Sequence, residues 1–203
     1  EFFMRDNSYI SLKCDCTVMR GKNFTETRNF VDAPFIESLA KYNLQLAYFS
    51  PRTDKIRPYV KFGLGTDGYR SDDPSIDLQS ESANLGAGLI LTTSTQLRAS
   101  LNFFEYQKQN NWSIWQEDNL FGYFEKEMIS SGIDIDWFPG TNQEFRLKAF
   151  IYGIRASYAR AFRVNASGFM TAAIDDLNEF QLSEVAFQVR YKYEFSPLSN
   201  LYV

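Results

Sequence analysis

The sequence predicts an all-β protein, specifically an antiparallel up-and-down transmembrane β-barrel. Apolar residues recur at every second position in several segments of about 9–11 residues, which is the length of a strand that crosses a bilayer. The connections between these segments alternate between long and short, as they do at the two rims of an outer-membrane barrel. We therefore expect a bacterial outer-membrane location, with lipid against the apolar face of every strand.

The first half of the chain supplies five of the predicted strands, over residues 9–19, 41–49, 59–69, 82–91 and 97–103. In the first of them, Leu12, Cys14 and Cys16 alternate with Lys13 and Asp15, which is a period of two. The predicted connections are a long loop over residues 20–39, a short turn over 50–56, a polar loop over 71–80 and a tight turn over 92–95.

The second half supplies predicted strands over residues 120–137, 144–151 and 185–194, and a ninth strand that begins near residue 200. A loop that contains Trp112 and Trp115 should precede them. The other connections are turns over residues 139–142 and 196–200 and a long loop over 157–182. Aromatic residues near the strand ends fit the girdles of a barrel at the two membrane interfaces. They are Tyr42, Tyr48, Phe103, Trp137, Tyr191 and Tyr193.

Charged residues occupy the polar face of the predicted strands, which we expect to line the lumen. The set comprises Lys13, Asp15, Lys61, Arg98, Asp134, Asp136, Arg146, Lys148, Arg190, Lys192 and Glu194. Because both signs occur together, they favour a salt-bridged, partly filled interior over an ion-selective path. Symmetry about Gly140 predicts that Asp134 lies opposite Arg146. Glycines at 63, 65, 86 and 88 should face the lumen or relieve strand curvature.

The C-terminal third resembles a known family. Residues 137–148 (Trp-Phe-Pro-Gly-Thr-Asn-Gln-Glu-Phe-Arg-Leu-Lys) look like a hairpin of its barrel, and residues 184–203 contain its Arg-Tyr-x-Tyr strand and Pro-Leu-Ser turn. The family is the outer-membrane barrel domain of unknown function that usually follows a carbohydrate-binding family-9-like module. The resemblance implies further strands upstream. We therefore expect residues 1–203 to form one β-barrel domain that is incomplete at both ends, as the C-terminal part of a larger barrel.

The chain lacks the residues that several kinds of functional site require. The chain has no histidine, which excludes a Ser-His-Asp triad and a histidine-bearing zinc site. We predict no catalytic, cofactor-binding or metal site, and the net charge of −4 gives no nucleic-acid surface. Trp112 and Trp115 remain candidates either for a membrane interface or for stacking on a ligand. In the loop over residues 71–80, Asp72, Asp73 and Asp77 could instead hold a calcium ion. For the fold, the alternative to a membrane barrel is a soluble β-sandwich.

The leading functional hypothesis is a non-enzymatic outer-membrane barrel. It would serve as a membrane anchor or scaffold, or as a subunit that binds a partner, with outer-membrane lipid, other outer-membrane subunits or a glycan as the expected partners. The alternative is a channel for small solutes or oligosaccharides, since the inner face is polar. A third hypothesis is a hydrolase that uses Asp134 or Asp136 as a carboxylate catalyst.

Overall fold

A computed structural model of the protein describes residues 2–4, 6, 8–17, 21–23, 35–51, 55–94, 96–196 and 199–202. Every regular element in these ranges is a strand. The long strands are β2 (Tyr9–Thr17), β5 (Lys41–Phe49), β6 (Ile56–Gly68), β7 (Gln79–Ser94), β8 (Leu97–Glu117), β9 (Leu120–Gly140), β10 (Gln143–Val164) and β12 (Phe180–Ser196). The short strands are β1 (Phe2–Phe3), β3 (Gly21–Asn23), β4 (Ile36–Ser38), β11 (Met170–Ala172) and β13 (Ser199–Tyr202). The described ranges hold no helix that is long and apolar enough to span a bilayer.

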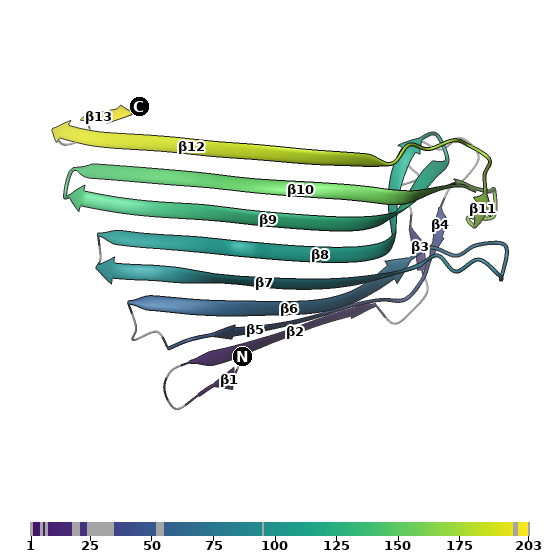
Figure 1. Ribbon diagram of the computed structural model, residues 1–203, viewed down its shortest axis with the longest axis horizontal. Coiled ribbons are helices and arrows are strands. Elements are labelled where there is room, and N and C mark those ends of the chain that lie inside the picture. Colours follow the sequence, from purple (N-terminus) through teal and green to yellow (C-terminus); the bar gives the residue numbers. More distant parts are fainter. Residues whose placement is uncertain are drawn as a thin grey trace.

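The long strands, together with the short strands β1 and β13, form one antiparallel sheet in the order β1-β2-β5-β6-β7-β8-β9-β10-β12-β13, with β11 paired to β10 (Figure 1). Each strand pairs with its neighbour in the chain through a hairpin, apart from the inserted β3–β4 pair and β11. The predicted all-β, antiparallel, up-and-down arrangement is therefore confirmed. The sheet is open between β1 and β13, so the described strands do not form a closed barrel.

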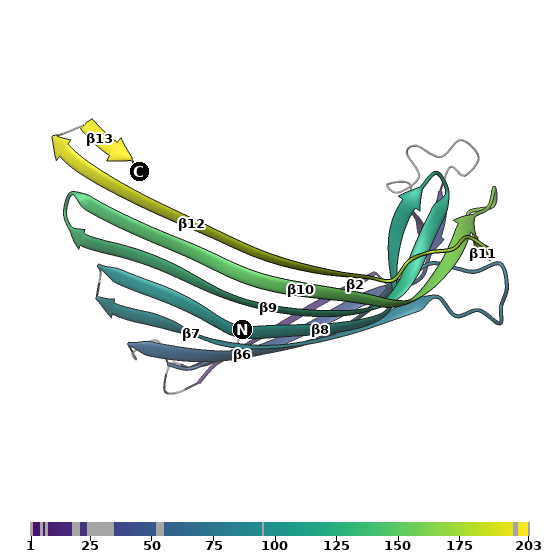
Figure 2. The same cartoon turned by 45° about the horizontal axis from the view of Figure 1, so that its top comes forward.

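The sheet curves into a trough with two different ends (Figure 2). One end, here called the loop end, carries β3, β4, residues 69–78, the β8–β9 hairpin and β11. The other, the turn end, is where β5 ends and β6 begins, and likewise β7 and β8, β9 and β10, and β12 and β13. The connections at the turn end are short, and those at the loop end are longer except in the β8–β9 hairpin, where two residues separate the strands, so the expected alternation of long and short connections fails at that hairpin.

The polar face of the sheet is its concave face. The rings of Trp112 on β8 and Phe180 on β12 have centroids 6.3 Å apart, although β9 and β10 lie between these strands. Flat neighbouring strands lie about 4.8 Å apart, so strands three places apart would be separated by about 14 Å. The two rings can meet only on the inside of a curve. The strand register places Phe180 in the same cross-strand row as Ala156 and Lys126, and thus on the polar face.

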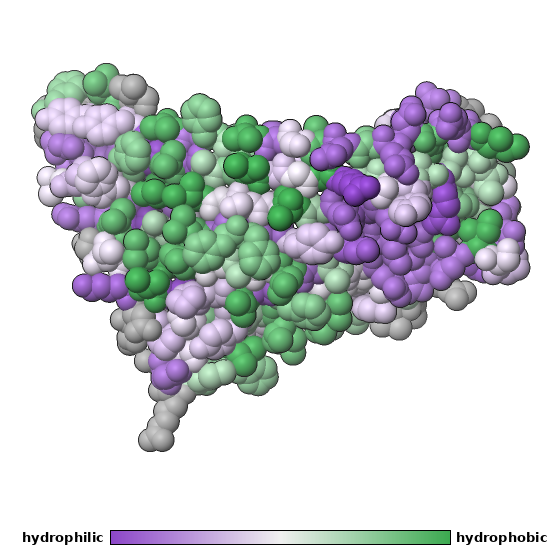
Figure 3. Space-filling view, in the orientation of Figure 1, coloured by the Kyte–Doolittle hydropathy of each residue, from purple (hydrophilic) through white to green (hydrophobic). Residues whose placement is uncertain are grey.

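The convex face carries a continuous apolar band, and hydrophobic side chains gather over the middle of the strands in Figure 3. On β9 the band runs from Ile129 to Trp137, which corresponds to a height of about 20–25 Å for a tilted strand. Its side chains are open: Phe187 is 79% exposed and Ile151 is 56% exposed. No second sheet covers this face within the described ranges, in contrast to the packing of a soluble β-sandwich.

Two expectations about the elements are wrong at the loop end. Trp112 and Trp115 lie within β8 and not in a loop, since β8 and β9 continue until only Asp118 and Asn119 separate them. Residues 157–164 belong to β10, and the expected long loop there is shorter and contains β11. The extra strand length exists because these hairpins extend beyond the apolar band. The predictions for residues 18–20, 24–34, 52–54, 95, 197–198 and 203 lie outside the described residues.

The loop end has a hydrophobic core of its own. Its buried side chains are Ile36, Leu78, Phe121, Tyr123, Phe162, Val164 and Met170. Each such side chain contributes about 1.5–3 kcal/mol when it leaves water. The main chains of the three loop segments are also joined, since the Arg70 amide donates to Glu37 O at 2.9 Å and the Met170 amide donates to Arg70 O at 2.8 Å. We call this unit, made of β3, β4, residues 69–78 and β11 on the ends of β9 and β10, the loop-end platform.

Gly168 shows why the sequence turns sharply before β11. Its φ is +83°, and a Cβ there would lie 2.6 Å from the ring of Phe35. Asn165 closes the same turn, because its Oδ1 accepts from the amides of Ser167 at 2.9 Å and Phe169 at 3.1 Å. Glycine tolerates both the left-handed backbone and the close ring, so the turn can dock on the loop-end platform.

Candidate functional site

A ladder of charged side chains crosses the concave face near the turn end. Lys148 Nζ lies 3.0 Å from Asp134 Oδ2, and Arg146 Nε lies 3.5 Å from Asp136 Oδ1. Arg146 also contacts Glu144 on its own strand. Because these side chains are partly exposed, each contact contributes at most about 1 kcal/mol. The ladder therefore neutralises a polar surface more than it stabilises the sheet.

The sequence-based prediction for this hairpin is wrong by two residues. Asp134 lies opposite Lys148, and Arg146 lies opposite Asp136. The turn occupies Thr141 and Asn142, and a bulge follows between Gln143 and Phe145, so the centre of the hairpin is displaced from Gly140. Since the shift is an even number of residues, both pairs remain on the concave face.

The strand register places the other charged residues of the predicted set on the concave face too. Arg98 lies opposite Asp136, Arg190 opposite Arg146 and Lys192 opposite Glu144. Glu194 follows on the same face of β12. Lys13 and Asp15 on β2 and Lys61 on β6 lie in other cross-strand rows of the concave face. Among these, Lys13 Nζ lies 3.0 Å from Asp15 Oδ2. The eleven residues thus share one surface, and the structure brings Asp134, Asp136, Arg146 and Lys148 together within it.

An aromatic cluster occupies the concave face near the loop end. The ring centroid of Phe124 lies 6.4 Å from that of Trp112 and 5.5 Å from that of Phe180. Lys126 Nζ lies 4.9 Å from the Trp112 ring centroid, an attractive cation–π geometry. Burial lowers the pKa of the Lys126 amine, and the Asp67 carboxylate opposes that shift. The cluster ties β8, β9 and β12 together across the trough.

The two tryptophans have different environments. The ring of Trp112 packs in the aromatic cluster, which leaves little of it for stacking on a ligand. Trp115 is 44% exposed at the end of the β8–β9 hairpin, where its Nε1 donates to Asp118 O at 2.8 Å. It lies far along β8 from the apolar band, whose last convex residue on that strand is Tyr106.

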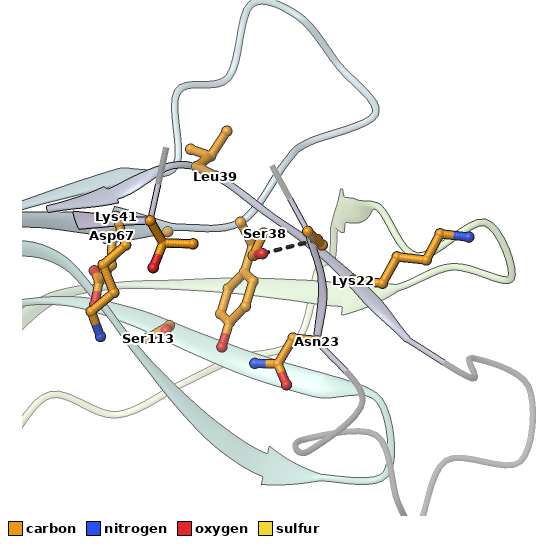
Figure 4. A pocket seen from close by; sticks show the side chains of 11 residues that line it. Lys22, Asn23, Ser38, Leu39, Lys41, Asp67 and Ser113 are labelled. Carbon is orange, nitrogen blue, oxygen red and sulfur yellow. Dashed lines mark hydrogen bonds between the residues drawn. The ribbon is translucent and has the colours of Figure 1, made fainter. Parts of the chain in front are cut away.

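A cavity of about 530 Å³ opens at the loop end between β3, β5, β6 and β8 (Figure 4). Its walls carry Lys41, Asp67, Asn23 and Ser113, with opposite charges and several hydrogen-bonding groups on one surface. Lys22 points away from the space, and its Nζ lies 3.9 Å from the Phe35 ring centroid. Such a lining suits a small polar solute that both donates and accepts hydrogen bonds.

Tyr123 is the cross-strand neighbour of Ser113, which lines this cavity. It is fully buried, pairs with Ser113 across the hairpin, and its hydroxyl makes no hydrogen bond with any described residue. Burial raises the pKa of its phenol well above the ordinary value, and the nearby Tyr69 adds to the shift. An unpaired buried hydroxyl costs about 1–3 kcal/mol, so this position is a local weakness of the loop-end platform.

The acidic loop gives no support to a calcium site. Asp72 Oδ2 accepts from Thr171 Oγ1 at 2.6 Å, and Asp77 Oδ1 accepts from the Gln79 amide at 2.8 Å. Asp73 Oδ1 accepts from the Ser75 hydroxyl at 2.7 Å and from the Ser75 amide at 2.9 Å, and these two hydrogen bonds lower the pKa of its carboxyl. Asp73 and Asp77 close turns and Asp72 joins the loop to β11, and no group of three metal-binding side chains occurs in the described ranges.

A cation tether that sequence reasoning missed joins two loop segments. Arg163 donates to both oxygens of Asp175, at 2.8 and 3.1 Å, and its Nη1 donates to Asn119 Oδ1 at 3.0 Å. The hydrogen bond from Arg163 lowers the pKa of Asp175. Periodicity could predict neither the contact of Arg163 with Asp175 nor the proximity of Lys126 to Asp67, because the residues of each pair lie on segments that are not paired with each other in the sheet. Comparison of this chain with protein-family models, curated proteins and solved structures found no match.

Proposed function

We propose that this sheet forms part of the wall of a bacterial outer-membrane β-barrel, which serves as a membrane anchor and carries the loop-end platform as its partner-binding surface. The observation that supports the proposal is the division of the sheet into an exposed apolar convex face and a charged concave face. In water, an open apolar face of this extent is unfavourable. Against hydrocarbon, the same face is favourable, and its height is close to the apolar band of known barrels, about 25 Å.

Closure of the barrel follows from the same physical argument. Lipid offers no hydrogen bonds to an open sheet edge, and an unsatisfied backbone group there costs several kcal/mol. The outer edges of β2 and β12 are only partly covered, by β1 and β13 at the turn end. We infer that further strands, from the same chain or from a neighbouring subunit, complete the barrel. The resemblance of residues 137–148 and 184–203 to a larger barrel domain favours the same chain.

The anchor hypothesis rests on the character of the two surfaces. The charges of the concave ladder are paired with each other, as in a filled interior, and the loop-end platform has its own hydrophobic core and joined main chains. A rigid platform above an apolar band can hold a partner, for which another outer-membrane subunit or a glycan remains the candidate.

Fractionation of cells that produce the full-length protein tests the proposal. We expect the protein to sediment with outer membranes, to resist extraction by carbonate, and to migrate differently on gels before and after heating. Recovery in the soluble fraction would contradict the membrane assignment. Turnover of lipid, peptide or glycan by the purified protein, lost on substitution of Asp134 or Asp136 by Asn, would replace the anchor by the hydrolase hypothesis.

A channel for small solutes or oligosaccharides is the second candidate, and the cavity at the loop end favours it. That cavity opens beside the polar concave face, so a solute bound there would lie at the mouth of the lumen. Planar-bilayer recordings of the full-length protein distinguish the two. Stepwise conductance that falls on addition of solute supports a channel, whereas a silent bilayer with inserted protein supports the anchor.

A further inference from the structure

We propose that an apolar track on the concave face binds the sugar rings of an oligosaccharide. The track consists of Phe150 and Tyr152 on β10 and of Leu182 and Phe180 on β12. The inference rests on the proposed barrel, whose lumen the concave face would line, and it gives that lumen a binding site and a class of ligand.

The track is continuous along the strands. Its side chains occupy four successive cross-strand rows of the concave face, which are the rows of Phe150, Tyr152, Ile154 and Ala156 on β10. Leu182 lies opposite Ile154, and Phe180 lies opposite Ala156. The track therefore extends for about 20 Å along the wall of the trough, where β10 and β12 run side by side (Figure 2). It begins beside the charged ladder and ends at the aromatic cluster.

The Phe150 ring is uncovered on the sides of both neighbouring strands. Its row neighbours are Gly132 on β9 and Ala186 on β12, and neither is large enough to cover an aromatic ring. Phe150 is 45% exposed, and its ring is nearly parallel to that of Tyr152, with 6.0 Å between the centroids and 12° between the planes. Leu182 is 48% exposed. A row of open apolar side chains is unfavourable in a water-filled lumen and marks a ligand-binding surface.

Hydrogen-bonding groups flank the track on both sides. Tyr152 Oη donates to Glu184 Oε2 at 2.8 Å, which holds that carboxylate beside the rings on β12, and Ser130 lies opposite Tyr152 on β9. Lys148 and Asp134 lie 3.0 Å apart at the turn end of the track. A sugar ring has apolar C–H faces and hydroxyl groups around its edge, so an apolar strip between donors and acceptors matches it in both respects. The charges of both signs favour a neutral, polyhydroxylated ligand over an ion.

The width of the track distinguishes a sugar chain from a segment of protein. The track is one side chain wide in the rows of Phe150 and Tyr152, whose neighbours on both strands are small or polar. A protein segment that packs against the sheet buries a broad apolar cluster, as the loop-end platform does. A single chain of rings therefore fits the track better than a protein plug.

Calorimetric titration of the full-length protein in detergent micelles tests the site. The ligands are hexasaccharides of α-1,4-linked glucose, β-1,4-linked glucose and β-1,4-linked mannose, with sorbitol as a polyol that lacks a ring. We expect saturable binding of at least one hexasaccharide and no binding of sorbitol. Phe150→Ala should weaken the binding about five- to tenfold, the equivalent of about 1–1.4 kcal/mol for one lost ring contact.

Two further variants separate the site from a general effect on the sheet. Ala186→Leu places an apolar side chain against the Phe150 ring without removing any ring, and it should weaken binding by a similar factor. Phe187 is the next residue on β12 but lies on the convex face, so Phe187→Ala should leave the affinity unchanged. Each variant should keep the change in gel mobility on heating that reports a folded barrel. Absence of binding by all three hexasaccharides overturns the inference, as does an equal loss in Phe187→Ala and Phe150→Ala.

The proposed function fails differently from the sugar site. A membrane-inserted protein that binds none of the hexasaccharides overturns only the track, whereas a protein recovered in the soluble fraction that binds one overturns only the membrane assignment. A protein plug is detected by Phe150→Cys in a background with Cys14→Ser and Cys16→Ser. Failure of that cysteine to react with a water-soluble maleimide would show that protein covers the track, and would overturn the inference; a rapid reaction that a bound hexasaccharide slows supports it.

Discussion

A charge placed on the convex face distinguishes a lipid-facing surface from a solvent-facing one. Leu101 lies in the middle of the apolar band, opposite Leu89 on β7 and Ile133 on β9. If this face contacts hydrocarbon, Leu101→Arg places a cation near the bilayer midplane and costs about 2–4 kcal/mol. Because 1.4 kcal/mol is a factor of ten, the folding equilibrium should fall by about 30- to 700-fold.

The neighbouring residue supplies the control. Ser100 lies on the concave face opposite Asp134, so Ser100→Arg adds the same side chain next to a carboxylate. We expect that variant to remain within about 0.5 kcal/mol of the unsubstituted protein. The assay is reversible urea unfolding of the full-length protein in phospholipid vesicles, followed by tryptophan fluorescence. Equal destabilisation by the two substitutions, or an unchanged midpoint for Leu101→Arg, would refute the assignment of the convex face to lipid.

Three further predictions concern the loop end and the concave face. Arg163 lowers the pKa of Asp175 below its ordinary value of 3.8, so the tether should be intact above pH 3.8 and be lost as the pH falls through the lowered pKa. Amide hydrogen exchange of the loop should therefore become faster over that pH range, and Asp175→Asn should remove this pH dependence. Tyr123→Phe removes an unpaired buried hydroxyl and should leave the free energy of unfolding unchanged or raise it by about 1 kcal/mol, whereas a loss above that amount would reveal a partner for the hydroxyl. Gly88→Ala would bring a Cβ to 2.3 Å from Leu101 O and 2.5 Å from Tyr59 Oη and should cost about 1–3 kcal/mol in urea unfolding. Tyr59→Ala should relieve only the part of this cost that comes from the ring, because the Leu101 carbonyl stays in place, and complete relief would contradict the main-chain clash.

Periodicity predicted the sheet well because, on every strand, one face carries apolar side chains and the other carries mostly polar ones. Alternation of Leu97, Leu101 and Ile133 with charged or small residues fixes which face each side chain occupies, independently of register. The eleven charged residues were therefore assigned to a common face from sequence alone. Which of them pair requires the exact turn, and the bulge after Gln143 moved Asp134 from Arg146 to Lys148.

The loop end could not be predicted in the same way. Around Trp112, Phe121 and Phe124 both faces of the β8–β9 hairpin carry aromatic residues, so the alternation that identifies a strand disappears. Both faces are apolar because the hairpin contacts the aromatic cluster through some residues and the loop-end platform through others. Contacts of this kind join segments far apart in the chain, such as Arg163 with Asn119, and single-sequence periodicity carries no information about them.

Spin-label scanning along β9 in lipid vesicles tests the central claim most directly. Single labels at residues 129–137 of the full-length protein are compared for collision with oxygen, which concentrates in hydrocarbon, and with a water-soluble nickel chelate. The convex positions, Ile129, Ser131, Ile133, Ile135 and Trp137, should show higher oxygen collision than their neighbours, with the nickel profile reversed. Oxygen collision that is equal at all positions, or highest at the concave ones, would contradict an apolar face turned to lipid.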